Sequence, residues 1–368
     1  MSKYTQKDTP IESQVIASLK EFVYPLFETD LVTLKALQSV SSLEGCVHIE
    51  LELGAHLLSH QPRLQMMLKD HLEGAGFAGS KIIININVPV ADRGNPNAGS
   101  RPRNILLVAS GKGGVGKSTT AINLALALRA EGASVGVLDA DIYGPSMRTM
   151  LGVSDTIKPK LIDEKLVKPV RKYGLETMSV GYMSPDKAPM IWRGPMAVKA
   201  VQQLLDQTVW GNLDYLIVDM PPGTGDIHIS LAQKLKRSKA VVITTPQEVS
   251  LIDARKGLEM FNKVGIQVLG VIENMATHVC SACGHEEDIF GAEGAKNMAD
   301  DYGLPLLGSL PLDKMVREHL DEGNPSVARD PASAISQRYL LLAQRVGVAV
   351  WKTSLNDAVQ VPIIEISS

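Results

Sequence analysis

The residues from Gly111 to Thr119 have the types and the spacing that phosphate binding needs. They read G-K-G-G-V-G-K-S-T and fit the pattern G-x-x-x-x-G-K-[ST]. An apolar stretch over 105–109 precedes them, and a helical stretch over 119–128 follows. Glycines let backbone N–H groups turn toward phosphate oxygens, and the N-terminus of a helix adds partial positive charge. The pattern therefore predicts a loop that holds the phosphates of a nucleotide.

The side chains of this loop have different expected roles. We expect Lys117 to reach the β- and γ-phosphates and the Ser118 hydroxyl to hold Mg²⁺. Lys112 is a second lysine, which either lies solvated on the surface or crosses to the nucleotide of a second subunit, as an arginine finger does. The predicted nucleotide-binding residues of the loop are Gly111, Lys112, Gly113, Gly114, Val115, Gly116, Lys117, Ser118 and Thr119.

Carboxylates follow two further apolar stretches, which we expect to be strands beside the loop. Asp139 ends the stretch 135–139, and Asp141 comes two residues later. Such groups can hold Mg²⁺ or its waters, or orient an attacking water. Asp219 ends the stretch 215–219 and is the carboxylate expected on the Mg²⁺ side. The loop after it, M-P-P-G-T-G-D, has the composition of a defined but movable switch loop.

A second site is indicated by the pair Cys280 and Cys283 in C-S-A-C-G-H. Two thiolates on one tight turn converge on one ion, so this spacing suits a metal or a cluster. Several sites fit: an iron–sulfur cluster bridging two chains, a zinc ion held by two chains, a zinc ion held by one chain with His278 or His285, a redox dithiol, or two inert cysteines. Chemistry alone favours a metal of some kind.

Composition limits the other possibilities. The chain has 368 residues, of which 45% are hydrophobic and 21% charged, and its formal net charge is −3. We expect no nucleic-acid partner, because no large basic field is available, and no membrane partner, because no apolar run is long enough to span one. With three cysteines and a polar N-terminus we expect a cytoplasmic protein from a reducing compartment. Cys46 is expected to be a buried core thiol.

The pattern of apolar stretches predicts two domains. Residues 1–90 read as a small α+β domain, 91–103 as a linker rich in proline, glycine and asparagine, and 104–368 as an ATPase domain. In the second domain, helical stretches separate short apolar strands over 105–109, 135–139, 215–219, 240–244, 268–272 and 306–310. This alternation predicts an α/β fold, a doubly wound and mainly parallel sheet with helices on both faces.

Longer stretches of the chain resemble a known family. The loop with its second lysine resembles the deviant phosphate-loop class, which includes the nitrogenase iron protein and the positioning and partition ATPases. Four stretches are similar to the Mrp/ApbC family of iron–sulfur cluster carriers: D-A-D-I-Y-G-P-S from 139, W-R-G-P-M from 192, D-M-P-P-G-T-G-D from 219, and E-N-M from 273 leading to the cysteine pair. The resemblance covers roughly residues 103–350. The N-terminal domain is similar in size and placement to that of many bacterial members, but it lacks the short cysteine motif of some.

This resemblance implies an ATP-binding homodimer that carries one labile [4Fe–4S] cluster. Cys280 and Cys283 of both subunits would ligate the cluster at the interface, and slow ATP hydrolysis would be coupled to cluster binding or to its transfer to apoproteins, after loading by a donor. Lys112 would act across the dimer, Asp141 would be the switch-loop carboxylate, and Asn274 would lie where the purine base is read. The implied catalytic residues are Lys112, Lys117, Asp141 and Asp219, with Ser118 and Asp219 on Mg²⁺.

Three alternatives belong to other classes. A positioning or partition switch of the ParA/MinD kind needs a basic surface or a basic amphipathic end helix, which the C-terminal stretch from Val359 lacks. An electron-transfer reductase would keep its cluster and cycle its redox state. A dimeric ATPase held together by zinc would use the same cysteines.

Overall fold

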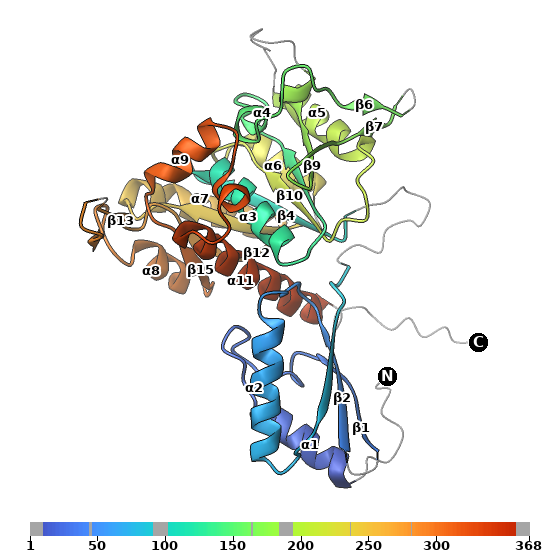
Figure 1. Ribbon diagram of the computed structural model, residues 1–368. Coiled ribbons are helices and arrows are strands. Elements are labelled where there is room, and N and C mark those ends of the chain that lie inside the picture. Colours follow the sequence, from blue (N-terminus) through green and yellow to red (C-terminus); the bar gives the residue numbers. More distant parts are fainter. Residues whose placement is uncertain are drawn as a thin grey trace. The chain divides into compact units, whose positions relative to one another are not determined.

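A computed structural model describes residues 10–43, 46–90, 102–162, 165–183, 194–235, 237–280 and 282–357 (Figure 1). The chain divides into two compact units. The first comprises Met1–Pro89 together with Gly347–Ser368, and the second comprises Val90–Val346. None of the helices in the described ranges is both long and apolar enough to cross a membrane.

The first unit is built on a three-stranded sheet. Its elements are α1 (Pro10–Glu21), β1 (Leu37–Leu43), β2 (Cys46–Leu53), α2 (Gln61–Gly74) and β3 (Lys81–Ile86). In the sheet, β2 lies in the middle, antiparallel to β1 and parallel to β3. The alternation predicted for 47–53 is observed, because every second residue from Val47 to Leu53 is buried. The missed strand β1 reads L-Q-S-V-S-S-L, in which serines obscure the alternation.

The C-terminal boundary differs from the prediction that 104–368 forms one domain. The long helix α11 (Ala334–Asp357) begins in the second unit, and its residues from Gly347 on belong to the first. Val348 and Trp351 are buried in the core of the first unit, where the Trp351 ring meets Phe27 edge-on at 5.7 Å between centroids. An aromatic pair of this kind buries a large apolar area, which assigns the end of the helix to that core.

The second unit contains an eight-stranded sheet in the order β15-β12-β11-β4-β10-β5-β9-β8. All neighbouring pairs are parallel except β8 with β9. The six predicted strands correspond to β4 (Asn104–Ser110), β5 (Val135–Asp139), β10 (Tyr215–Asp219), β11 (Lys239–Thr244), β12 (Gln267–Glu273) and β15 (Leu306–Ser309). Central strands such as β5, β10 and β11 are buried along their whole length, as expected for a sheet covered on both faces.

The second unit also contains helices, short strands that were not predicted and a 3₁₀ turn. Helices α5, α6, α7 and α8 pack against one another in order, and α3, α9 and α10 form a second group (Figure 1). The helices of this unit, apart from α11, are α3 (Lys117–Ala130), α4 (Met147–Met150), α5 (Gly194–Gln207), α6 (Asp226–Lys234), α7 (Glu248–Val264), α8 (Gly294–Asp301), α9 (Lys314–Asp321) and α10 (Ser326–Arg329). The short strands that were not predicted are β6 (Lys160–Leu161), β7 (Val167–Lys168), β8 (Val170–Lys172), β9 (Leu175–Ser179), β13 (His278–Val279) and β14 (Glu286–Glu287), with a 3₁₀ turn over Val180–Tyr182.

The register of the central strands places the candidate carboxylates Asp139 and Asp219 side by side. Asp219, the last residue of β10, pairs with Asp139 at the end of β5 and with Val108 near the end of β4. The phosphate loop leaves β4 just beyond this row. The carboxyl ends of three parallel strands thus meet at one edge of the sheet, where ligands bind in folds of this kind.

Candidate functional site

The phosphate loop connects β4 to α3 and passes very close to two other segments. Gly116, the residue before α3, has a φ of +83°, and a Cβ built on it would lie 2.1 Å from Nδ2 of Asn274. A Cβ on Gly111 would lie 2.2 Å from the backbone carbon of Asp253 in α7. Glycine is therefore required at both positions, by conformation and close approach at Gly116 and by close approach alone at Gly111.

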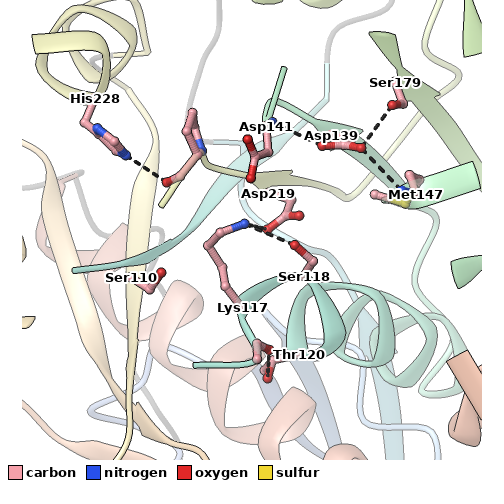
Figure 2. Close-up of polar contacts among 12 residues, drawn as sticks. Ser110, Lys117, Ser118, Thr120, Asp139, Asp141, Met147, Ser179, Asp219 and His228 are labelled. Carbon is pink, nitrogen blue, oxygen red and sulfur yellow. Dashed lines mark hydrogen bonds and ion pairs between the residues drawn. The ribbon is translucent and has the colours of Figure 1, made fainter. Parts of the chain in front are cut away.

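Lys117 and Ser118, the first two residues of α3, lie near Asp219 (Figure 2). The Lys117 ammonium forms a buried ion pair with Oδ1 of Asp219 and lies 3.2 Å from Oγ of Ser118. Oδ2 of Asp219 is buried and has no hydrogen-bond partner among the described residues. The carboxylate with its unpartnered oxygen and the hydroxyl both lie next to the Lys117 ammonium. Together they form an oxygen donor set that suits Mg²⁺, so these residues fit the ion.

Asp139 and Asp141 have different surroundings. Asp139 is buried, and its oxygens accept hydrogen bonds from the Asp141 N–H at 3.1 Å, from the Ser179 hydroxyl at 3.0 Å and from the Met147 N–H at 3.4 Å (Figure 2). Burial, followed by the charge of Asp219, raises the pKa of Asp139 to about 7. Its oxygens are thus occupied in fixing the start of the loop after β5.

Asp141 is only half-buried, and its carboxylate feels both charges of the ion pair. Burial is the largest influence and raises the pKa of Asp141, the charge of Lys117 lowers it, and that of Asp219 raises it. Of the two carboxylates after β5, Asp141 is therefore the one available to solvent and to a ligand near Lys117. Lys112 is also partly exposed, and its backbone carbonyl accepts a hydrogen bond from the Ser110 hydroxyl at 2.9 Å.

The loop after Asp219 is held by a histidine that the sequence analysis did not single out. Nε2 of His228 donates a hydrogen bond to the Pro221 carbonyl at 2.8 Å (Figure 2). The backbone N–H of Gly223 donates to the Ser110 carbonyl at 3.0 Å, which ties the same loop to the end of β4. Burial lowers the pKa of His228, so the ring is neutral at pH 7. The sequence feature that could have singled out His228 is its position in the first turn of a helix that follows a glycine-rich loop.

Asn274 follows β12 directly and lies against the phosphate loop. Its side chain is buried, and Nδ2 donates a hydrogen bond to the Val115 carbonyl at 2.8 Å. The backbone N–H of Asn274 donates to the Thr244 carbonyl at 2.8 Å. The contact with the loop was not foreseen from the sequence, which suggested a base-reading role. That role stays a prediction, because a primary amide has a second N–H and an acceptor oxygen.

The two cysteines lie on a turn between β13 and β14. The N–H of Cys280 donates to the His285 carbonyl at 2.8 Å, and the N–H of Gly284 donates back to the Cys280 carbonyl at 2.8 Å. Hydrogen bonds from the backbone N–H groups of Ala282 and Cys283, and then from the Cys283 thiol, lower the pKa of Cys280. A thiolate stabilised in this way is ready to ligate a metal.

Each chain offers the two thiols as an incomplete ligand set. Both are free, with Cys283 exposed and Cys280 partly exposed. Across the ranges that the structure describes, no group of three or more His, Cys, Asp or Glu side chains could hold a metal ion. His278 and His285 thus do not complete a site with the thiols there.

Two further features of the sequence are Cys46 and the W-R-G-P-M stretch from 192. Cys46, the first residue of β2, is partly exposed rather than buried, and its thiol donates to the Gly79 carbonyl at 2.9 Å. The W-R-G-P-M stretch begins with Trp192 and Arg193, which lie outside the described residues.

Comparison with known proteins identifies the family. Residues 101–347 match the model of the family described as "ParA: NUBPL iron-transfer P-loop NTPase". The chain belongs to this family. It is 45% identical over 359 residues to the iron-sulfur cluster carrier protein of Salmonella typhimurium, an alignment that covers 95% of this chain and 96% of the relative. It is also 48% identical over 246 residues to the mouse iron-sulfur cluster transfer protein NUBPL, covering 66% of this chain and 76% of that one.

A solved structure supports the fold of this P-loop NTPase. The nucleotide-binding protein of Archaeoglobus fulgidus, determined in complex with ADP, superposes with a TM-score of 0.55 at 30% identity, covering 64% of this chain and 91% of that chain. The resemblance to the Mrp/ApbC family and the predicted α/β fold with a mainly parallel sheet are thereby confirmed.

Proposed function

We propose that this P-loop NTPase is an ATP-dependent carrier of a [4Fe–4S] cluster, which it holds between two copies of the chain and transfers to apoproteins. The observation that carries the proposal is the cysteine turn. It presents two accessible thiols on one turn, and backbone N–H groups stabilise the Cys280 thiolate. A [4Fe–4S] cluster takes four thiolates, so two chains related by a twofold axis supply the full set.

The nucleotide part of the proposal rests on the geometry around Lys117. Lys117 would bind the β- and γ-phosphates, Ser118 and Asp219 would hold Mg²⁺, and the backbone from Gly111 to Thr119 would cradle the phosphates. When bound, Mg²⁺ neutralises charge on the phosphates. Asp141 would orient the attacking water, and Lys112 would neutralise developing charge on the nucleotide of the partner subunit. Asn274 would contact the base.

In this account the cluster is the cargo and ATP is a conformational regulator. The Asp219 loop, tied to His228 and Ser110, is the segment that responds to the γ-phosphate, as switch loops do. An exposed turn gives the cluster few protein contacts, which suits transfer rather than storage. The partners are then a second copy of this chain, a cluster donor and acceptor apoproteins.

A transfer assay tests this function. Protein loaded with cluster under anaerobic conditions is mixed with an apo-enzyme that becomes active only on receiving a [4Fe–4S] cluster, with and without Mg-ATP. We expect acceptor activity to appear while the carrier loses its iron–sulfur absorbance. Cys283→Ser protein serves as the matched control and should deliver nothing. Retention of the cluster with reversible reduction by dithionite would instead identify an electron-transfer protein and overturn the carrier function.

A further inference from the structure

Asn274 lies between the phosphate loop and the cysteine turn. Its side chain contacts the phosphate loop, and its backbone continues through five residues to Cys280. The next residue, Met275, has a φ of +55°, so the chain turns sharply as it leaves β12. A residue without a glycine's freedom adopts this conformation only where surrounding contacts enforce it.

The stretch from Met275 to the cysteine turn is fixed along its length. The N–H of Ala276 donates to the Leu310 carbonyl at 2.9 Å, and the N–H of Leu312 donates to the Thr277 carbonyl at 2.7 Å. The Thr277 hydroxyl donates to Oε1 of Glu286, in the second strand of the cysteine hairpin, at 2.5 Å. Arg338 of α11 forms an ion pair with the same Glu286 oxygen at 3.1 Å. These contacts restrain the segment along its length, so a displacement at Asn274 displaces the cysteine turn as well.

At the other end of this segment, the Asn274 side chain contacts the phosphate loop at Val115 and Gly116. The Val115 carbonyl accepts the Asn274 amide, and the neighbouring Gly116 has no room for a Cβ beside that amide. The Gly116 carbonyl in turn accepts from the Thr120 N–H and hydroxyl, both at 2.9 Å, in the first turn of α3. A buried amide and a buried carbonyl are costly to leave unpaired, so a displacement of the loop moves Asn274 with it.

We propose that Asn274 is a positioning residue that couples the state of the phosphate loop to the geometry of the cysteine turn. This inference rests on the proposed function, since it assigns a purpose to the coupling of nucleotide and cluster. Through this path, nucleotide binding changes the exposure and spacing of Cys280 and Cys283. Linkage is reciprocal: by whatever factor ATP changes the affinity of the cysteines for the cluster, a bound cluster changes the affinity for ATP by the same factor.

The test follows the thiols directly and needs no cluster. Full-length apoprotein is alkylated with iodoacetamide with and without Mg-ATP, the rate at Cys280 is read by mass spectrometry, and ATP affinity is measured separately. In wild-type protein we expect Mg-ATP to change this rate by about fivefold or more, the lower end of ordinary allosteric coupling. Because this residue is also placed at the base, Asn274→Ala protein is compared at Mg-ATP concentrations that saturate it, and there the rate should no longer respond.

Two further variants separate coupling from general loosening. Asn123 is also a buried asparagine beside the loop. Its Nδ2 donates to the Thr119 carbonyl at 3.0 Å and its Oδ1 accepts from the Val327 N–H at 3.3 Å, so these two hydrogen bonds join it to α3 and α10 and not to the cysteine segment. Asn123→Ala should keep the nucleotide response. Thr277→Val removes the hydroxyl contact with Glu286 at a partly exposed position, so it should fold normally and weaken the response without changing ATP affinity.

The outcomes are distinct. The coupling is overturned if wild-type Cys280 does not respond to Mg-ATP, if Asn274→Ala and Thr277→Val proteins respond as wild type does, or if Asn274→Ala loses the response only by losing ATP binding. The last result would make Asn274 a nucleotide contact alone. Failure of wild-type protein to take up a cluster would overturn the proposed function, whereas the thiol response would still decide the coupling.

Discussion

Asp139 and Asp219 lie in register at the ends of adjacent parallel strands, yet their carboxylates have different hydrogen-bond partners. Asp139 is enclosed by donors from its own chain, whereas Asp219 has one oxygen on Lys117 and one without a partner among the described residues. Conversion to asparagine should therefore separate the two. We predict that Asp219→Asn lowers the rate of ATP hydrolysis by about 100-fold, the usual cost of losing one electrostatic contact in a site. Asp139→Asn should change it far less, and phosphate release at saturating Mg-ATP measures both.

The pH dependence of stability should report Asp139. Burial raises its pKa from 3.8 to about 7, so between these values the native state binds a proton that the unfolded state has lost. The contribution of this group therefore falls as pH rises from about 4 to 7 and is constant above that. We predict that the Tm of Asp139→Asn protein gains on that of wild type over this range and then runs parallel to it. Calorimetry from pH 5 to 8 measures the difference, and a variant Tm that falls relative to that of wild type as pH rises would contradict this assignment.

Removal of Lys117 should cost stability as well as ATP binding. The Lys117–Asp219 pair is buried on both sides, so Lys117→Ala leaves an uncompensated carboxylate in the interior. Breaking a buried pair typically costs about 3–5 kcal/mol. We predict a loss of this size in urea unfolding, with much of it recovered in the double variant Lys117→Ala/Asp219→Asn. An additive double variant would show that the two side chains do not interact.

His228 should affect hydrolysis more than binding. Its Nε2–H contact with Pro221 shapes the loop after Asp219, and a net hydrogen bond of about 1 kcal/mol corresponds to roughly fivefold in rate. We predict that His228→Ala lowers kcat by about this factor with little change in KM. His228→Gln, which can still donate, should lose less. Because burial keeps the pKa of His228 below its ordinary value, this effect should be the same from pH 7 to 8.5; a larger KM effect would show that the loop shapes nucleotide binding instead.

The Cys280 thiol should be unusually reactive in apoprotein. Backbone N–H groups of Ala282 and Cys283 lower its pKa, and the Cys283 thiol adds to the effect. We predict that the alkylation rate of Cys280 reaches half its maximum below about pH 8.5, the midpoint of an ordinary thiol. In Cys283→Ala protein this midpoint should move up part of the way, because the backbone donors remain. Rates at several pH values, followed by peptide mass spectrometry, give both midpoints; identical midpoints would remove the Cys283 thiol from the explanation.

The sequence predicted best what depends on local pattern. Six strands of the main sheet were foreseen because each is a short apolar run, and the phosphate loop because all its residues lie within one nine-residue stretch. The strands over 160–179 were missed, since pieces of two to five residues among lysines and prolines carry no clear period. The bond between Asn274 and Val115 joins residues 159 positions apart, and Trp351 packs in a core formed mainly by residues 15–82. Such pairings depend on how the chain closes, which periodicity does not encode.

The most direct test of the proposed function is anaerobic reconstitution with iron and sulfide, followed by metal and sulfide analysis per dimer. Cys280→Ala/Cys283→Ala protein, which keeps the phosphate site, is the matched control. We predict about four irons and four sulfides per wild-type dimer, as a [4Fe–4S] cluster requires, and neither in the control. Zinc in place of iron, or the same iron content in both proteins, would contradict a cluster held by these cysteines between two chains.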